Sequence, residues 1–280
     1  MSDPSSTHNG LREHAIPGST RRSVVRQRDG AMHRLEDAIA EEVPVAFIYN
    51  DAPFAVMMAT PADLEDFALG FSLSEGIVDA LAELSIESVS RRIEGWEMRL
   101  RILDTNAAAL EGRRRSLSGR SGCGICGSEL LEAAMRWPSP VGPGATIGSD
   151  ALHAALSGLA RMQHLGGVTG ATHAAAWADT HGNILRVRED IGRHNALDKL
   201  IGAMAREEID PQSGFAVITS RASYEMAMKA ASVGISLLAA VSAPTALAVT
   251  LAEHANLTLV GFARENGYAV YSHPHRISAP

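Results

Sequence analysis

Hydrophobic residues in the first part of the chain are spaced for two β-hairpins with a helix between them. Each hairpin joins two apolar runs through a short polar turn: residues 43–49 and 54–58 meet at Asn50-Asp51, and residues 86–93 and 96–103 meet at Glu94-Gly95. The helix is expected to have Thr60 as its N-cap and Pro61 at its first position, and to end at Gly76. We therefore expect residues 21–110 to form a small α+β subdomain, after a polar arm, residues 1–20, that is expected to be disordered.

The C-terminal half has a different pattern, in which apolar strands alternate with helices. An amphipathic helix is expected from Ser149 or Asp150 to about residue 165. Further strands are expected at 172–178, 184–189, 215–219, 235–241, 257–262 and 268–271, and further helices at 195–206, 223–231 and 245–254. Buried strands with intervening helices favour parallel pairs joined by right-handed crossovers. Residues 128–280 are therefore expected to form an α/β domain with a mixed, partly parallel sheet flanked by helices.

Three of the expected strands end in stretches that suit a ligand. Ligands of parallel sheets bind at the carboxyl ends of the strands, which here are Ser220-Arg221-Ala222-Ser223, Ser242-Ala243-Pro244-Thr245 and Phe262-Ala263-Arg264-Glu265-Asn266-Gly267. The first two are hydroxyl-rich helix N-termini, which suit phosphate oxygens. The third contributes Arg264 and a flexible turn. Hydroxyls at helix starts also serve as plain caps, and both interpretations stay open.

Composition and charge narrow the class of protein. A chain of 280 residues buries enough surface to fold without disulfide bonds, and its two cysteines fit a reducing compartment. The net charge of −7 argues against nucleic acid as a partner. Apolar runs are too short and too broken to cross a membrane. Arg21-Arg22 does not begin an export signal, because charged residues occupy the place of its apolar region. A cytoplasmic protein is therefore expected.

Both cysteines lie in one glycine-rich segment, Gly122-Cys123-Gly124-Ile125-Cys126-Gly127. Arg113, Arg114, Arg115 and Arg120 precede it, and Ser128 is the expected N-cap of a short helix that ends at Trp137-Pro138. Positive charge and a helix N-terminus lower the pKa of a thiol. We therefore expect residues 111–127 to form an arginine-rich connector and a mobile loop that presents reactive thiolates. A thioredoxin-like redox motif and half of a zinc site remain alternatives, whereas the glycines disfavour a buried cysteine pair.

Residues 189–199 are dense in charged groups, with Arg193 a candidate to bind an anion and His194 to transfer a proton. A charged turn capped into a helix explains the same pattern. His173 lies in an apolar strand, where a core histidine is the alternative to a functional one. A zinc deaminase is disfavoured, because Ala175 stands at the position of the catalytic glutamate and the CxxC precedes the histidine.

Several segments together resemble the formate dehydrogenase accessory sulfurtransferases, the FdhD family. The resemblance runs from about residue 40 to near the C-terminus and is carried by residues 122–127, 172–175, 188–199, 220–226, 240–245 and 259–262. It implies a cytidine-deaminase-like core and a homodimer. It also implies that Cys123 bears a persulfide and that Phe262, Ala263, Arg264, Glu265, Asn266 and Gly267 match the cofactor-binding stretch.

The function that this resemblance implies is sulfur transfer. A member of the family accepts sulfur from a cysteine desulfurase and passes it to the molybdenum cofactor, a bis(molybdopterin guanine dinucleotide), before insertion into formate dehydrogenase. The cofactor would be a bound substrate, GDP would mimic part of it, and no structural metal is expected. Its pyrophosphates would be held by side chains at the strand ends and at the 189–199 turn: Ser220, Arg221, Ser242, Thr245, Arg264, Arg193 and His194. Cys126 would either resolve the Cys123 persulfide or tune its thiolate. A non-catalytic cofactor chaperone and a CxxC thiol-disulfide reductase are the alternative functions.

Overall fold

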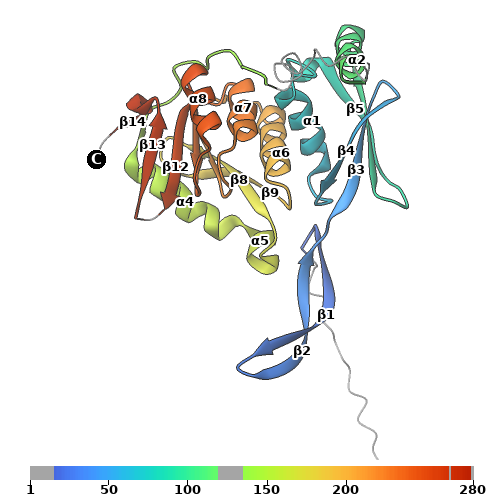
Figure 1. Ribbon diagram of the computed structural model, residues 1–280, viewed down its shortest axis with the longest axis vertical. Helices are drawn as coiled ribbons and strands as arrows, with labels where there is room; N and C mark the ends of the chain where they lie inside the picture. The colour runs from blue at the N-terminus through green and yellow to red at the C-terminus, as the bar shows by residue number, and fades with distance from the viewer. Residues whose placement is uncertain (1–15, 119–134, 265, 279–280) are drawn as a thin grey trace, which may run out of the picture.

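The computed structural model describes residues 16–118, 135–264 and 266–278. Two α/β layers lie side by side, and a long hairpin projects from beneath them (Figure 1). No helix in the described ranges is both long enough and apolar enough to span a bilayer.

The N-terminal layer is a four-stranded sheet with one helix on its face. Its strand order is β4-β3-β6-β5, from β3 (Val43–Tyr49), β4 (Ala52–Ala59), β5 (Leu84–Arg91) and β6 (Trp96–Ile102). Both predicted hairpins are confirmed, and β3 joins them by pairing in parallel with β6. Helix α1 (Leu64–Ser74) covers the sheet, with the rings of Phe47 and Phe67 in edge contact at 5.1 Å between centroids. A short 3-10 turn (Leu81–Glu83) precedes β5, and α2 (Asp104–Ser118) follows β6.

The start of α1 differs from the prediction. Asp63, with φ of 52°, precedes the helix, and Thr60 is not its cap. Thr60 is instead fully buried, and its backbone N–H donates to Asp190 Oδ2 at 3.0 Å. Thr60, the residue that the sequence suggests as a helix cap, therefore bonds instead to Asp190, which lies 130 residues further along the chain.

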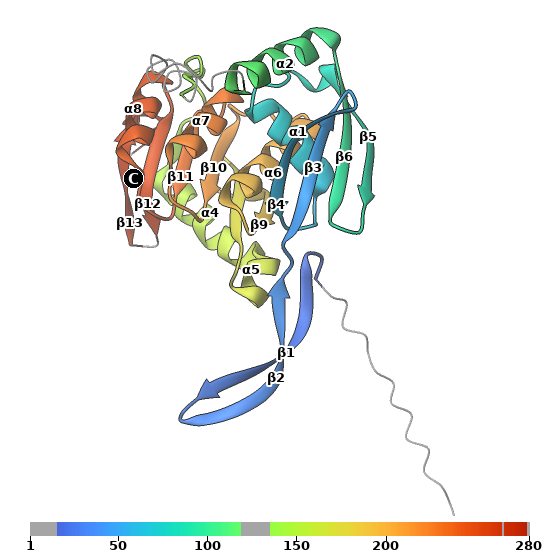
Figure 2. The same ribbon diagram turned by 45° about the vertical axis from the view of Figure 1, so that its right-hand side comes forward.

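A hairpin that the hydrophobic pattern did not predict forms a separate two-stranded sheet. Strands β1 (Ser19–Arg28) and β2 (Ala31–Ala40) pair in antiparallel along their whole length and extend away from both layers (Figures 1 and 2). Asp29 and Gly30 have φ of 51° and 81°, as a two-residue hairpin turn requires. β1 begins inside the stretch expected to be disordered, and residues 1–15 lie outside the described part. The predicted division of the chain into residues 1–20, 21–110, 111–127 and 128–280 stays a prediction.

The C-terminal layer is a six-stranded mixed sheet, as predicted. Its order is β13-β12-β11-β10-β8-β9, with β10, β11 and β12 parallel and the other neighbours antiparallel. The strands are β8 (His173–Asp179), β9 (Ile184–Asp190), β10 (Gly214–Ile218), β11 (Leu237–Ala240), β12 (Thr258–Arg264) and β13 (Gly267–Ser272). A short parallel pair, β7 (Ile147–Gly148) and β14 (Ile277–Ser278), and a 3-10 turn (Pro274–Arg276) complete the unit.

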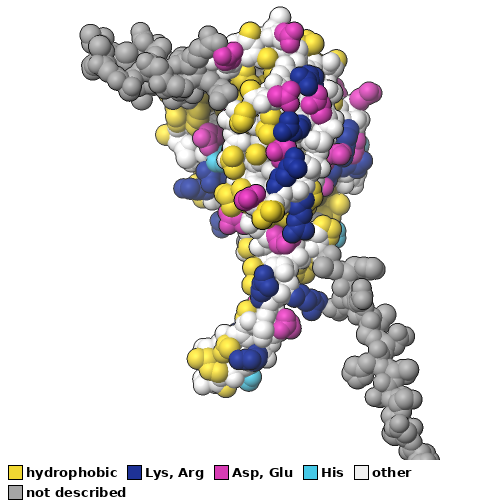
Figure 3. Space-filling model, turned by 90° about the vertical axis from the view of Figure 1, so that its right-hand side faces the viewer, with side chains coloured by type: hydrophobic (Ala, Val, Ile, Leu, Met, Phe, Trp, Pro, Cys, Tyr) yellow, Lys and Arg dark blue, Asp and Glu magenta, His cyan; other side chains and the backbone are white. Residues whose placement is uncertain are grey.

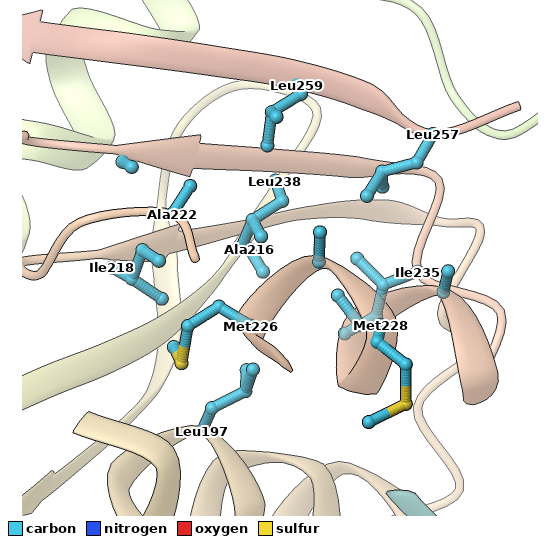
Figure 4. Packing of buried hydrophobic residues seen from close by; sticks show 14 of the residues in the cluster. Leu197, Ala216, Ile218, Ala222, Met226, Met228, Ile235, Leu238, Leu257 and Leu259 are labelled. Atoms are coloured by element: carbon cyan, nitrogen blue, oxygen red, sulfur yellow. The ribbon is translucent and has the colours of Figure 1, made fainter. Parts of the chain in front are cut away.

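Helices cover both faces of this sheet. Helices α6 (Arg193–Arg206), α7 (Tyr224–Ser232) and α8 (Ala246–His254) pack on one face. Figure 4 shows Leu197 of α6 and Met226 of α7 pointing toward each other below the strand residues of this cluster. Helix α4 (Ser149–Met162) packs on the other face, and α5 (His164–Thr169) follows it.

The two layers meet where α1 crosses α6 with their backbones in contact. A Cβ atom on Gly70 would lie 1.7 Å from the Asp198 carbonyl oxygen, and one on Gly202 would lie 1.9 Å from the Asp66 carbonyl oxygen. Only glycine fits at these two positions. This close approach fixes the N-terminal layer against the helices that carry the candidate site.

Candidate functional site

The strand ends expected to form a ligand site lie next to one another at the carboxyl edge of the six-stranded sheet. Thr245 N–H donates to the Ala222 carbonyl at 3.0 Å, and Phe262 N–H donates to the Ser242 carbonyl at 3.2 Å. Ala222 and Pro244 also form an isolated parallel bridge. The loops after β10 and β11 and the end of β12 are therefore joined through their backbones. We call this surface, residues 219–225, 241–245 and 262–267 with Arg193 and His194, the carboxyl edge.

Hydroxyl groups at this edge differ in their local partners. Thr245 caps α8 by accepting from Ala248 N–H at 3.3 Å, and Ser220 Oγ donates to the Arg221 carbonyl at 3.1 Å. Ser223 occupies the N-cap position of α7 with extended backbone angles, but its side chain forms no capping bond. Its Oγ is buried and has no hydrogen-bond partner among the described residues. Ser223 therefore presents an unused hydroxyl at a helix N-terminus.

Two more unpaired buried atoms lie at the start of α6, which also reaches this edge. Arg193 Nε and His194 Nε2 are buried without hydrogen-bond partners in the described ranges. Leaving a buried donor unpaired costs about 1–3 kcal/mol, so such groups usually have a reason. Arg193 Nε and Ser223 Oγ are both donors, and each is of the kind that pairs with a phosphate oxygen.

Two histidines add groups that can take a proton. Burial, and secondarily the Arg193 charge, lower the pKa of His173, the first residue of β8. Burial also lowers the pKa of His194, although Glu225 opposes it. His194 Nε2 lies 2.6 Å from Glu225 Oε2, but the approach is not aligned for a hydrogen bond. Burial therefore favours the neutral form of both histidines, and Glu225 acts against this at His194.

The end of β12 has a strained backbone. Phe262 has φ of 52° inside a strand, and 45% of its surface is exposed. Such a conformation is costly for a residue other than glycine and marks functional sites. A cavity of about 390 Å³ lies beside it, lined by Phe262, Arg264, Asn266, Gly267, Tyr268 and Ala269. Ala263 is instead buried in the core, and Glu265 lies outside the described residues.

A second cavity, of about 240 Å³, lies between α1, α6 and α7, and His194, Tyr224, Glu225 and Arg136 are among its lining residues. Lys229 also lines it and is nearly buried, at 5% exposure. Its Nζ lies 2.7 Å from Glu75 Oε1, 2.9 Å from Asp198 Oδ2 and 3.0 Å from Ser74 Oγ. Burial opposes the ammonium charge, but the two carboxylates outweigh it and raise the pKa of Lys229. Lys229 is therefore an ammonium group whose charge Glu75 and Asp198 neutralise, and it ties α7 to α6 and to the end of α1.

Most of the charged segment 188–199 holds the two layers together. Lys199 Nζ and Asp190 Oδ2 are fully buried and 2.7 Å apart, and Lys199 also donates to the Thr60 carbonyl at 3.0 Å. Asn195 Nδ2 donates to the Met58 carbonyl at 2.8 Å. Only Arg193 and His194 of this segment take part in the carboxyl edge. The buried residues Asp190, Asn195 and Lys199 of this segment therefore have a structural role.

The predicted reactive segment lies outside the described residues. This covers Cys123, Cys126, Arg120 and the expected helix from Ser128, and the side chains of Arg113, Arg114 and Arg115. The chain re-enters the structure at Met135. Arg136 N–H then donates to Tyr224 Oη at 2.5 Å, and Tyr224 Oη donates to the Arg136 carbonyl at 2.8 Å. The chain that follows the cysteines is thus attached to the first residue of α7.

Sequence reasoning missed Tyr224, Lys229 and Arg136 as members of this region. A signal for Lys229 was present, because the lysine interrupts the apolar run Met226–Ala231 of a helix that had to be buried. Nothing local indicated the pairing of Arg136 with Tyr224, which are 88 residues apart.

A family model, curated relatives and a solved structure all relate this chain to the same family of proteins. The sequence model of the FdhD/NarQ family matches residues 40–278. "Sulfur carrier protein FdhD" of Xanthomonas euvesicatoria pv. vesicatoria (strain 85-10) is 60% identical over 261 residues, which are 93% of each chain. The protein of the same name from Cupriavidus necator is 53% identical over 255 residues, 91% of this chain and 88% of that one. The crystal structure of a putative formate dehydrogenase accessory protein from Desulfotalea psychrophila has a TM-score of 0.71 at 22% identity, covering 94% of this chain and 100% of that one, and so shares the fold.

Proposed function

The chain belongs to the FdhD/NarQ family, and from this we propose that it is a sulfur carrier required for formate dehydrogenase activity. It accepts sulfur from a cysteine desulfurase as a persulfide on Cys123 and delivers it to the molybdenum cofactor before the cofactor enters formate dehydrogenase. Relatives that cover nearly the whole chain are called sulfur carriers, which supports the first part. The structural observation that supports the second part is two buried donors without hydrogen-bond partners among the described residues, Arg193 Nε and Ser223 Oγ.

The described residues fit a bis(molybdopterin guanine dinucleotide) as bound substrate. Arg193 and Ser223 would donate to pyrophosphate oxygens, and the N-terminal ends of α7 and α8 add positive potential. Arg221 and Arg264 are exposed at the same edge and add two charges. The exposed ring of Phe262 offers a flat face to a guanine. GDP, with one guanine and one diphosphate, is the proposed mimic of half of this substrate.

Sulfur loading is a thiol exchange that needs no external oxidant. The Cys123 thiolate attacks the outer sulfur of the desulfurase persulfide, and the sulfur–sulfur bond to the desulfurase cysteine breaks. The desulfurase thiolate leaves, and Cys123 now carries the outer sulfur. A histidine at the carboxyl edge would accept a thiol proton, and His194 is the candidate because its ring lies at the start of α6 beside Glu225.

The two proposed roles of Cys126 give different products. As a resolving group, its thiolate attacks the inner sulfur of the Cys123 persulfide, so that hydrosulfide leaves and a Cys123–Cys126 disulfide forms. As a tuning group, it remains a thiol throughout. The disulfide route leaves the protein oxidised by two electrons, and a reductant of the dithiol class must then restore it.

An intact-mass experiment tests the persulfide. The protein is incubated with a cysteine desulfurase and cysteine, and its mass is recorded before and after reduction with dithiothreitol. We expect one labile sulfur on the wild type and on Cys126→Ser, and none on Cys123→Ser. A Cys123→Ser protein that still gains a labile sulfur would contradict the assignment.

One observation also favours a cofactor chaperone without sulfur chemistry. The unpaired atoms of the carboxyl edge all lie in the described residues and do not depend on the cysteines. Such a chaperone would restore formate dehydrogenase activity in cells as Cys123→Ser, whereas a sulfur carrier would not. A thiol-disulfide reductase would instead reduce insulin, which a persulfide carrier does poorly.

The remaining parts of the family resemblance also stay proposals. They are the cytidine-deaminase-like character of the core, the cytoplasmic location, and the homodimer. Cysteine desulfurase and formate dehydrogenase are the proposed protein partners.

A further inference from the structure

One carboxylate of the N-terminal layer bridges two cations from the C-terminal part of the chain. Glu75 follows the last turn of α1, and its Oε1 lies 2.7 Å from Lys229 Nζ of α7. Its Oε2 lies 2.8 Å from Arg136 Nη2, and its backbone carbonyl accepts from Arg136 Nη1. Each carboxylate oxygen of this one side chain therefore holds a different cation.

The two cations depend on Glu75 to different degrees. Lys229 has a second carboxylate, because Asp198 Oδ2 lies 2.9 Å from its Nζ. The guanidinium of Arg136 has further contacts with neutral atoms, such as Met228 Sδ at 3.3 Å from Nη2. Removal of the Glu75 carboxylate would therefore release the guanidinium of Arg136 but leave Lys229 paired.

Partial burial distinguishes Glu75 from the ion pairs on the outer face of the N-terminal sheet. Figure 3 shows acidic and basic side chains together on that face, where Arg99 pairs with Asp51, which is 64% exposed. Exposed pairs of this kind contribute little, because water and salt screen them. The Glu75 side chain is 30% exposed, and the two cations that it bridges would repel each other without it. Glu75 therefore has more influence on the position of its partners than the outer carboxylates have on theirs.

Arg136 is also the point at which the chain that leads from the cysteines reaches the carboxyl edge. Its backbone N–H and carbonyl are bonded to Tyr224 Oη, and its side chain is bonded to Glu75. The hydroxyl belongs to α7 and the carboxylate to the end of α1, so Arg136 is held by both layers. Orientation of a reacting group contributes a large part of the rate in transfer reactions, so the hold on Arg136 bears on sulfur delivery.

We propose that Glu75 is a positioning residue for sulfur delivery, and that it acts through Arg136. With the carboxylate in place, the chain that leads from the cysteines is held between α1 and α7. Without it, that chain loses its attachment to α1 and spends less time in the orientation that delivery needs. The N-terminal layer then contributes to delivery as well as to the fold. This proposal rests on the sulfur delivery proposed above.

Limited digestion of the full chain with trypsin tests the contact without any sulfur chemistry. Trypsin cuts after Arg136 when this part of the chain leaves its partners, and the product begins at Trp137. We expect Glu75→Gln to release that product about three- to tenfold faster than the wild type, the factor for one half-exposed hydrogen bond between charged groups. Glu65→Gln is the matched control, because Glu65 lies on the same helix and pairs with Arg206 at 3.5 Å. It should leave the rate unchanged, and equal rates in all three proteins would overturn the proposal.

Cleavage after Lys199 is the internal reference for this experiment. Lys199 is fully buried in α6, so trypsin reaches it only when the protein unfolds as a whole. The Lys199 product should appear at the same rate from all three proteins. If it accelerates in Glu75→Gln as much as the Arg136 product does, Glu75 stabilises the fold and does not hold Arg136 specifically, which would also overturn the proposal.

A delivery assay then separates positioning from a purely structural role. Each protein is first loaded with sulfur by a cysteine desulfurase, and formate dehydrogenase activity is followed while the concentration of the loaded protein is varied. We expect Glu75→Gln to carry as much labile sulfur as the wild type and to activate the enzyme at a several-fold lower maximal rate, with the concentration for half-maximal rate unchanged. A maximal rate equal to that of Glu65→Gln would overturn the proposal. A wild type that carries no labile sulfur would contradict the sulfur function and the proposal with it, while the tryptic rates would still show whether Glu75 holds Arg136.

Discussion

Tyr224 Oη holds both backbone groups of Arg136, accepting from its N–H at 2.5 Å and donating to its carbonyl at 2.8 Å. Arg136 also donates through Nη2 to Glu75 Oε2 at 2.8 Å. Cys123, the proposed persulfide residue, precedes Arg136 by thirteen residues, a length of chain that spans at most about 47 Å. The chain that leads from the cysteines is therefore held at Tyr224, within the carboxyl edge.

Tyr224→Phe should separate sulfur loading from sulfur delivery. The change removes one hydroxyl and with it both bonds to Arg136, so the segment that carries the cysteines loses an attachment at α7. We expect normal persulfide formation with the desulfurase and a several-fold lower yield of active formate dehydrogenase. Tyr271→Phe on β13 is the size-matched control. Equal yields from the two variants would mean that the Tyr224 contact does not position the segment.

Ser223→Ala should weaken ligand binding without weakening the fold. An N-cap serine usually contributes about 0.5–2 kcal/mol, but Ser223 forms no capping bond, so its loss should leave the free energy of unfolding nearly unchanged. The affinity for GDP should fall about five- to tenfold, the value of one hydrogen bond. Urea unfolding and calorimetric titration measure the two quantities.

Thr245→Ala provides the contrast for that experiment, because its hydroxyl does cap α8. It should lower the free energy of unfolding by about 0.5–2 kcal/mol. If Ser223→Ala costs as much stability as Thr245→Ala, the Ser223 hydroxyl is an ordinary cap and the case for a ligand there fails.

The fold should lose stability in mild acid because of His173. Burial lowers the pKa of this histidine in the folded protein, so the unfolded chain binds its proton first as pH falls. The stability contribution is complete above the unfolded value of about 6.5 and decreases as pH falls from there toward the lowered folded value. His173→Gln should reduce the drop in melting temperature between pH 7.5 and pH 5.5, whereas exposed His181→Gln should not. An identical drop in all three proteins would contradict the prediction.

The buried pair of Lys199 and Asp190 should respond differently to single and double changes. Lys199→Met leaves the Asp190 carboxylate buried without its charged partner, which should cost about 3–5 kcal/mol. Adding Asp190→Asn removes the stranded charge, keeps an acceptor oxygen for one of the backbone N–H groups that bond to Asp190, and should restore part of that loss. Urea unfolding of the two single variants and the double variant measures the coupling. A double variant whose loss equals the sum of the single losses would show that the pair is not coupled.

Local patterns predicted much of the fold. Apolar alternation located both N-terminal hairpins, and the order of strands and helices after residue 214 predicted the parallel part of the sheet and the meeting of Ser220, Ser242 and Arg264 at one edge. The start of α1 was wrong because Thr60 bonds to Asp190, a contact that no local rule contains. The hairpin of β1 and β2 was missed because charged and exposed residues occupy both faces of its strands, although the Asp29-Gly30 turn was a usable signal.

Individual side chains at the site were harder to predict than the edge itself. Arg193 and His194 were chosen from a run of charged residues in which Asp190, Asp198 and Lys199 proved to be buried. Sequence alone cannot separate the candidate site residues of this run from the buried structural ones, because the burial of each residue depends on contacts with α1 and α7. The roles of Cys123 and Cys126 remain predictions that the persulfide experiment tests.

Because α1 and α6 are in direct backbone contact at Gly70 and Gly202, the two layers depend on each other for their folded structure. A fragment that contains only the six-stranded sheet would expose the groove that α1 fills and would lose the Thr60 partner of its Asp190–Lys199 pair. Neither layer is therefore suited to be transferred alone into another chain by recombination. Proteins descended from this one would be expected to keep or lose the two layers together. The hairpin of β1 and β2, which has no buried residue, is free to diverge.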